Sequence, residues 1–537
     1  MFLTKLDYKL GTPWIKWLIL GFLGLCITII RLPTFWESLW YGDENIYLAV
    51  AHGLSNSQKL YQDVWDNKPP LLYLIYCVSY QISGVNVWGF RLINLGFSLL
   101  ALVSFWHLVL NLGRDLFRVR LVTLGTVIST VFFGMLLGFG WEMTQLNAEN
   151  VYMPLIILGL YFWSRTFREG LAISVNRSGF NYLAVGICFS LACFTKIHAV
   201  AEIGVLLYLI LWQSWERQGL KLGAFVRYQL PRVGLVIGLI ALPYFGLIVW
   251  YLSRGLGSIL YYSLLGFGSD YVARNSPLIF GLPIFGYPTS LITNLQFRLL
   301  LLVGLVAGLS FARFKKLISY QYMFIALWLG ACFFGAMISE RNYPHYLIQV
   351  FGALSLLVFG LVDYLGWSQD LLRLKVQSVI AIVLLLNMGT MIFGSGQVIP
   401  IYETNTWNKF SRVLVGSMSL ADYQRSNNPG AWDRAKILLP IIDQYTVLGD
   451  KIYLVANDSE LYPLSNRVSG HRQITDFQYD TSIDEVYRVL VSNKTKLIII
   501  DNNSPVKKQF DKLLGQNYVL LPVGGLGGRY EVWVLRP

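Results

Sequence analysis

The sequence predicts a polytopic α-helical membrane protein with a small α/β domain at its C-terminal end. Of the 537 residues, 55% are hydrophobic and 14% are charged, whereas soluble domains carry about 25% charged residues. Apolar runs recur as far as residue 395, many of them near the length of about 20 residues that a membrane-spanning helix needs. Beyond that point the composition becomes polar, and short β-rich runs alternate with helical patterns. These three observations predict the fold class.

The apolar runs predict about eleven membrane spans. They are 14–32, 88–112, 121–140, 150–164, 180–195, 197–213, 232–252, 293–312, 320–338, 343–364 and 376–395. The run 69–84 is shorter and begins with two prolines, so we expect a juxtamembrane or half-inserted helix there, with a full span as the alternative. Arg31, Pro33 and Trp36 follow the first run in place of a small-residue cleavage site, which favours an uncleaved span over a signal peptide.

The basic residues predict the orientation of the chain. With the N-terminus inside, one set of loops holds most of the arginines and lysines, for example Arg313, Lys315 and Lys316 in a single loop. The opposite set holds few: Lys59, Lys68, Lys196, Arg254, Arg274 and Arg341. Basic residues concentrate in cytoplasmic loops, so we expect an inside N-terminus and a C-terminal domain on the outer face. Counting 69–84 as a full span would destroy this alternation.

Composition also excludes some classes of protein. The net charge of +13 is explained by the positive inner loops. The sequence contains no basic tract with interleaved exposed aromatics, so we expect no nucleic-acid partner. The five cysteines all lie in apolar segments without a CxxC spacing. The sequence therefore predicts neither structural disulfides nor a cysteine metal site.

We divide the chain into three parts. Residues 1–395 form the transmembrane module, in which 33–68 is the first outer loop and 69–84 the juxtamembrane helix. Residues 396–430 form a linker, and 431–537 form the α/β domain. In that domain we expect helices over 431–446, 482–493 and 505–514, and strands over 451–457, 496–501, 518–523 and 530–535. The last two strands flank a glycine-rich turn and predict a hairpin; no helix follows that turn, which excludes a dinucleotide-binding loop.

The stretch 41–70 carries the most suggestive residues. It opens with the adjacent carboxylates Asp43 and Glu44 and closes with Lys68 before Pro69 and Pro70. A carboxylate here can act as a general base, whose rate effect is about 10²–10⁴-fold; the structural alternative for Asp43 is a helix N-cap. Proline at a helix start holds Lys68 at a helix N-terminus, where anions bind, although interfacial lysines are common. We expect a bent outer loop whose two ends meet.

Other ionisable groups lie on the predicted outer face. Glu149 can pair with a cation, orient an acceptor or cap the next span. Lys196 and Arg341 are candidate ligands of a lipid phosphate, and an ordinary interfacial position is the alternative for each. His345 and Tyr346 can contact a substrate or anchor the interface.

Metal binding has little support in the sequence. His198 and His345 are isolated histidines without ligand spacing, so we predict no metal site from them. Carboxylates on the outer face can bind a divalent cation, and that cofactor stays open. Arg91 lies inside a candidate span, where we interpret it as a side chain that snorkels to the interface.

Four stretches, in this order, resemble the GT-C glycosyltransferases, and within them the bacterial branch of the protein O-mannosyltransferase superfamily that includes the ArnT-like enzymes. The stretches are GDENIY (42–47), LYQDVWDNKPPL (60–71), LNAENVYMPL (146–155) and RNYPHYL (341–347). The likeness covers roughly residues 15–365, and its first two motifs are the most specific.

The resemblance implies an inverting sugar transfer from a polyprenyl-phosphate donor on the outer face of the bacterial cytoplasmic membrane. Asp43 would be the base and Glu44 its acidic neighbour, while Lys68, Lys196 and Arg341 would hold the donor phosphate. A phosphate leaving group needs charge stabilisation more than protonation. The chain has fewer spans than ArnT and lacks the inserted β-trefoil of the eukaryotic enzymes, so the acceptor (lipid, polysaccharide or protein) stays open.

Two other functions fit the same outer-face charges. One is a transporter or lipid flippase, and the other is an assembly factor for envelope polysaccharide. A transporter would place ionisable groups near the middle of the membrane, and most candidate spans lack them. An enzyme would gather the outer charges around one cavity.

Overall fold

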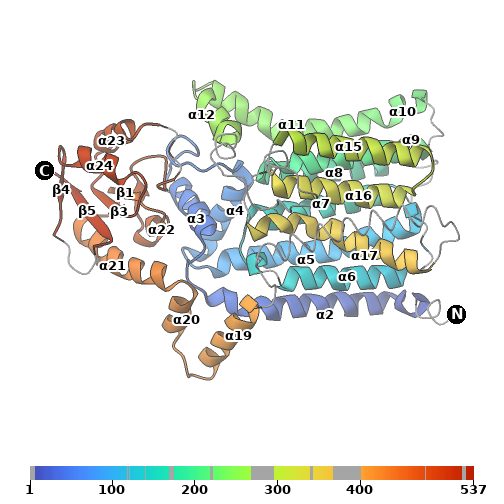
Figure 1. Cartoon of the computed structure of the whole chain (residues 1–537), viewed down its shortest axis with the longest axis horizontal. Helices are drawn as coiled ribbons and strands as arrows, with labels where there is room; N and C mark the ends of the chain where they lie inside the picture. Colours follow the sequence, from blue (N-terminus) through green and yellow to red (C-terminus); the bar gives the residue numbers. More distant parts are fainter. Residues whose placement is uncertain are drawn as a thin grey trace, which may run out of the picture. The chain divides into compact units, whose positions relative to one another are not determined.

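The computed structural model places most of the chain in helices (Figure 1). It describes residues 7–117, 119, 121–139, 141–167, 175–217, 222–267, 295–338, 343–366, 401–477, 479, 481–522 and 528–537. The chain forms two compact units. The first unit comprises 1–32, 94–247 and 271–404, and the second comprises 33–93, 248–270 and 405–537.

The first unit is a bundle of apolar helices. Its helices are α2 (Pro13–Arg31), α5 (Trp88–Asn111), α6 (Val122–Phe139), α7 (Ala148–Arg165), α8 (Val175–Thr195), α9 (Ala199–Arg217), α10 (Leu222–Tyr228), α11 (Leu230–Leu252), α15 (Leu295–Phe314), α16 (Tyr320–Met337) and α17 (Phe351–Gly366). Shorter turns are η2 (Leu112–Phe117), η3 (Trp141–Met143) and η5 (Pro344–Val350). Helices α5 and α11 each cross the boundary between the units.

Close packing holds this bundle together. Helix α7 lies along α8, and α16 packs against α9, α15 and α17. A Cβ at Gly159 would come within 2.6 Å of the Phe189 ring. Gly159 therefore permits the close approach of α7 and α8, as small residues commonly do between membrane helices.

Five helices in the described part of the chain are long and apolar enough to cross a membrane. They are Pro13–Trp36, Trp88–Phe117, Phe225–Leu252, Tyr320–Met337 and Pro344–Leu361. Val122–Gly138 and Gly179–Thr195 are apolar but shorter. The expected spans 150–164, 197–213 and 293–312 coincide with α7, α9 and α15, while 376–395 lies outside the described residues. The protein is a polytopic α-helical membrane protein, as the sequence predicts.

The second unit contains the predicted first outer loop, and 14 residues of that loop form a helix. This helix, α3 (Gly42–Ser55), occupies the middle of the loop, where we expected a bent loop. Helix α4 (Pro70–Ser83) follows, with Pro70 at its first helical position as predicted. Its 14 residues reach about 21 Å at 1.5 Å per residue, too short for a bilayer core of about 30 Å. The short helices η1 (Leu32–Trp36), α12 (Gly257–Tyr261) and η4 (Tyr262–Gly266) complete this part.

Two helices occupy most of the segment that we expected to be a linker. They are α19 (Ile401–Leu414) and α20 (Leu420–Asn427). The Ser419 side chain caps α20 by accepting a hydrogen bond from the backbone N–H of Asp422. Neither helix is apolar enough to have stood out from the sequence.

The C-terminal sheet confirms the predicted α/β domain. Its strands are β1 (Lys451–Val455), β2 (Val468–Ser469), β3 (Leu497–Asp501), β4 (Tyr518–Leu520) and β5 (Tyr530–Leu535), in the order β2-β1-β3-β5-β4. Strands β1, β2 and β3 run parallel, and Ile452 of β1 pairs with Leu497 of β3. Strand β5 is antiparallel to β3 and to β4, so the predicted hairpin is present.

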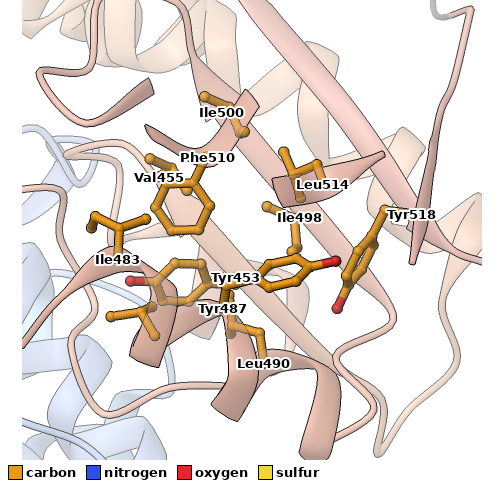
Figure 2. Packing of buried hydrophobic residues seen from close by; sticks show 11 residues of the cluster. Tyr453, Val455, Ile483, Tyr487, Leu490, Ile498, Ile500, Phe510, Leu514 and Tyr518 are labelled. Atoms are coloured by element: carbon orange, nitrogen blue, oxygen red, sulfur yellow. The ribbon is translucent and has the colours of Figure 1, made fainter. Parts of the chain in front are cut away.

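Helices α21 (Pro429–Tyr445), α22 (Leu461–Ser465), α23 (Ile483–Ser492) and α24 (Lys507–Leu514) surround this sheet (Figure 1). Figure 2 shows one buried cluster in which Tyr487 and Leu490 of α23 and Phe510 of α24 pack with Val455 and Ile498 of the sheet. The Ser482 hydroxyl accepts a hydrogen bond from the backbone N–H of Glu485 and begins α23.

Candidate active site

Asp43 and Glu44 lie in the first turn of α3. The N-cap of that helix is Tyr41, so the interpretation of Asp43 as the N-cap is wrong. Carboxylates in a first turn are stabilised by the positive end of the helix dipole. The two side chains differ in exposure: Asp43 is half-buried, whereas Glu44 is buried.

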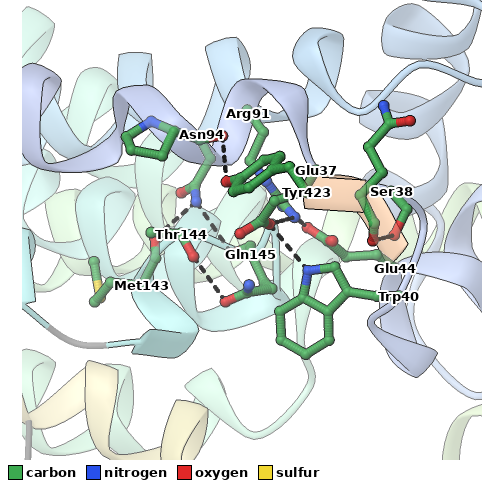
Figure 3. Close-up of polar contacts among 12 residues, drawn as sticks. Glu37, Ser38, Trp40, Glu44, Arg91, Asn94, Met143, Thr144, Gln145 and Tyr423 are labelled. Atoms are coloured by element: carbon green, nitrogen blue, oxygen red, sulfur yellow. Dashed lines mark hydrogen bonds and ion pairs between the residues drawn. The ribbon is translucent and has the colours of Figure 1, made fainter. Parts of the chain in front are cut away.

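Glu44 forms an ion pair with Arg91 of α5 (Figure 3). Arg91 Nη2 also lies 3.3 Å from Glu37 Oε2, and the Trp40 indole N–H donates to the same oxygen at 3.0 Å. The Arg91 side chain is 1% exposed. Arg91 therefore does not snorkel, which corrects that interpretation; a buried guanidinium needs carboxylate partners to offset its lost hydration.

The C-terminal part of this unit holds α3 and the chain before it. The Tyr423 hydroxyl donates to the Pro33 carbonyl at 2.9 Å, and the Ser38 hydroxyl donates to the Gln424 carbonyl at 3.0 Å. Farther along, the Asn45 amide donates to Glu460 Oε2 at 3.0 Å. These contacts tie the start of α3 and the chain before it to residues between 386 and 415 positions away.

Lys68 stands at the other end of the stretch, just before α4. The Tyr73 hydroxyl accepts a hydrogen bond from the Lys68 backbone N–H at 2.9 Å and donates to Asp66 at 2.8 Å. The Tyr61 hydroxyl donates to the Lys68 carbonyl at 2.5 Å. The half-buried Lys68 ammonium donates to Asn67 Oδ1 at 2.8 Å.

Aromatic contacts connect α3 to α4. The Tyr47 ring, one turn after Asp43, lies 6.2 Å from the Tyr73 ring and 5.5 Å from the Tyr76 ring. Tyr73 in turn binds the backbone of Lys68. Residues next to Asp43 and Lys68 are thus joined through one buried tyrosine cluster.

The first unit gathers a second set of predicted residues. Glu149, at the start of α7, forms an ion pair with Lys196, which lies between α8 and α9. The Lys196 ammonium also lies 4.3 Å from the centre of the Tyr346 ring. Glu149 thus pairs with a cation, which is one of the alternatives that the sequence left open.

His345 belongs to the same unit but uses a different carboxylate. Its Nδ1 lies 2.8 Å from Glu142 Oε2, and its backbone N–H donates to that oxygen at 2.5 Å. The Tyr343 ring stacks on the imidazole at 5.6 Å. Glu142 is not among the site residues that we predicted from the sequence.

Two further predicted residues are His198 and Arg341. His198 is half-buried, and Arg341 lies outside the described residues. Within the described ranges, no three His, Cys, Asp or Glu side chains lie close enough to hold a metal ion.

Sequence comparisons find no relative. No family model matches the chain, and no curated protein matches it. Solved structures do match. ArnT from Cupriavidus metallidurans bound to undecaprenyl phosphate aligns over 97% of this chain and 98% of its own, with 15% identity and a TM-score of 0.56. The chain has the fold of a GT-C glycosyltransferase.

ArnT in the apo state gives a similar result, with a TM-score of 0.55 and 14% identity over 97% of this chain and 98% of that chain. An oligosaccharyltransferase from Archaeoglobus fulgidus in the apo form matches less well, at a TM-score of 0.44 and 10% identity over 91% of this chain and 70% of its own. The GT-C likeness to ArnT thus includes the C-terminal domain as well as the helices.

The ion pair of Arg91 yields a first prediction. Arg91→Met should destabilise the protein by about 3–5 kcal/mol, because Glu37 and Glu44 would stay buried without their cation. Arg425→Met removes the arginine of an exposed pair with Asp433 and should change stability little. Thermal unfolding of both variants in detergent measures the difference; equal melting temperatures would show that Arg91 is not needed to compensate the two carboxylates.

The contact between Asn45 and Glu460 yields a second prediction. Burial, reinforced by the neighbouring Asp458, raises the pKa of Glu460 to about 8. Near pH 4 the carboxyl is neutral in the folded and unfolded chains. Between about pH 4.5 and 8 only the unfolded chain loses the proton, so the folded state loses stability as pH rises.

Glu460→Gln removes this titration and keeps an oxygen for Asn45. Its melting temperature relative to the wild type should therefore rise from pH 5 to pH 8. Glu485→Gln, at an exposed position of α23, is the control. A Glu460→Gln effect independent of pH would contradict the raised pKa.

Proposed function

We propose that the protein is a membrane glycosyltransferase that moves a sugar from a polyprenyl-phosphate donor to an envelope acceptor. The observation that carries this proposal is the fold likeness to ArnT along nearly the whole chain, in a structure of ArnT bound to undecaprenyl phosphate. The orientation deduced from the basic loops puts the reaction on the outer face of the cytoplasmic membrane, with the N-terminus inside and the C-terminal domain outside.

In the proposed reaction, Asp43 is the general base. Its carboxylate takes the proton of the acceptor hydroxyl while the hydroxyl oxygen attacks the anomeric carbon. The bond between that carbon and the phosphate oxygen breaks, the configuration inverts, and polyprenyl phosphate leaves. Asp43 suits this role better than Glu44 because it is half-buried, whereas Glu44 is engaged by Arg91. Glu44 then positions the first turn of α3.

Cations stabilise the charge of the leaving phosphate in this proposal. Lys68 is the principal one, because hydrogen bonds from Tyr61 and to Tyr73 fix the backbone of this half-buried residue. Lys196 is held by Glu149 and Tyr346, so it would share its charge between that carboxylate and the donor. Arg341 is a further candidate from the motif likeness, and His198, His345 and Tyr346 are candidates for substrate contact.

Asp43→Asn tests the base. The amide keeps the shape of the side chain but cannot take a proton, so transfer from a polyprenyl-phosphate sugar should fall by about 10²–10⁴-fold. Turnover is measured in proteoliposomes with extracted envelope acceptors. Asp422→Asn, on α20, is the matched control. Unchanged sugar transfer by Asp43→Asn would show that Asp43 is not the base.

Lys68→Ala tests the phosphate contact. Charged hydrogen bonds contribute about 1.5–3 kcal/mol, so the affinity for undecaprenyl phosphate should fall about 10- to 100-fold. Lys59→Ala, at an exposed position earlier in the same segment, is the control. Binding is measured in nanodiscs without acceptor. Equal affinity of the two variants would mean that Lys68 is an ordinary interfacial lysine.

A further inference from the structure

A polar pocket of about 520 Å³ lies within the second unit. One wall comes from the segment after α3, through Asn56, Gln58 and Gln62. The opposite wall comes from the C-terminal domain, through strand β2 with its continuation to Arg472, and through α23. This volume lies within the range of about 300–1,000 Å³ that is usual for small-molecule sites.

Hydrogen bonds to main-chain carbonyls connect the segment after α3 to the C-terminal domain. The Trp65 backbone N–H donates to the Arg472 carbonyl at 2.7 Å, and the Gln58 amide donates to the Ser469 carbonyl at 3.2 Å. Ser57, which lines the pocket, has a φ of 67°. A serine rarely adopts this left-handed conformation, and such strain persists only where the surroundings impose it. The pocket is thus a built feature of this unit.

The lining carries no net charge. Lys451 and Arg472 are balanced by Asp63 and Glu485. Burial lowers the pKa of His471 to about 3, so its imidazole adds no charge at neutral pH. Helix α23 presents its last turn through Val489 and its C-cap through Asn493, and that end of a helix dipole is negative. A phosphate or another anion is therefore a poor fit.

The polar groups of the lining include both donors and acceptors. Amides come from both walls, with Gln62 on one side and Asn493 on the other, and Thr481 contributes a hydroxyl. Ile259, Val468 and Val489 add aliphatic surface between them. A sugar ring matches this surface, because each of its hydroxyls both donates and accepts and its C–H faces pack on aliphatic carbon.

We propose that this pocket binds a neutral, hydroxyl-rich saccharide, and that this saccharide is part of the acceptor. The second half of the proposal rests on the proposed glycosyltransferase function. It also gives the C-terminal domain a function, since the domain selects a glycan acceptor together with the segment between α3 and α4.

The test measures saccharide binding separately from transfer. The full-length protein is placed in phosphatidylcholine nanodiscs, because glycoside detergents would compete. Saturation-transfer NMR then records binding of glucose, mannose, N-acetylglucosamine, cellobiose and diacetylchitobiose. Glucuronic acid and inorganic phosphate are the anionic probes. Asn493→Trp and Gln62→Trp fill the pocket from opposite walls, and Gln516→Trp adds the same indole at an exposed position after α24.

We expect at least one neutral saccharide to bind the wild type and the Gln516→Trp variant, and to bind about tenfold more weakly, or worse, to each pocket variant. Undecaprenyl-phosphate binding should be equal in all four proteins, which also shows that the variants are folded.

Lack of binding by every neutral probe, stronger binding of the anions, or equal binding in the pocket variants would overturn the proposal. A pocket variant that loses affinity for the sugar-loaded donor would assign the saccharide to the donor, and so would also overturn it. Failure of the proposed glycosyltransferase function is distinguishable from failure of this proposal. In that case the wild type would bind the saccharide but would not transfer sugar.

Discussion

Arg91 and Glu44 are both buried, and the start of α3 depends on their pairing. A guanidinium and a carboxylate each lose several kcal/mol of hydration on burial, and mutual attraction repays this only when the geometry is good and the remaining hydrogen-bonding groups find partners. Glu37 and Trp40 supply some of those partners. The result is a first helical turn held at one place, with Asp43 adjacent to a fixed neighbour.

The first unit also contains buried charged groups with partners: the buried Glu149 pairs with Lys196, and the buried His345 contacts Glu142. Only 14% of the residues are charged, and burying a charged group is energetically unfavourable. Buried ion pairs in such a chain therefore indicate functional or structural positions.

The C-terminal domain belongs structurally to the segment that carries Asp43 and Lys68. Asn45 bonds to Glu460, the His52 ring lies 3.2 Å from the Arg467 carbonyl, and Trp65 bonds to the main chain of Arg472. These contacts occur on α3 and on the segment that follows it, so the domain supports the whole of the predicted first outer loop. This arrangement gives a physical reason for its presence in a GT-C fold. A domain that only bound a distant partner would not need to hold the helix that bears the proposed base.

Patterns with a clear physical period were predictable from the sequence. Apolar runs of sufficient length located the helices of the first unit, because a membrane helix must present apolar surface over its whole length. Short β-rich runs located β1, β3, β4 and β5, and the predicted helix over 482–493 corresponds to α23. Among the elements that we did not predict are α10, α12, α19, α20, α22 and β2, which are short or polar. Helix α3 escaped because Gly42–Ser55 is only weakly apolar and contains Asp43, Glu44 and Asn45, which resemble loop residues.

The class of protein, the division between membrane helices and the α/β domain, and the candidate site residues could be predicted from the sequence. These properties follow from local composition and from motifs read along the chain. Which charged residues form pairs became known from the folded structure. Arg91 pairs with Glu44 over 47 positions, and Asn45 reaches Glu460 over 415. The unfavourable free energy of burying a charge requires that a partner exists. It does not specify where in the sequence that partner lies, so local patterns cannot predict the pair. For the stretch 41–70, local signals revealed its carboxylates and its lysine, whereas the tertiary structure shows that Gly42–Ser55 is a helix and that Tyr47 packs against Tyr73 of α4.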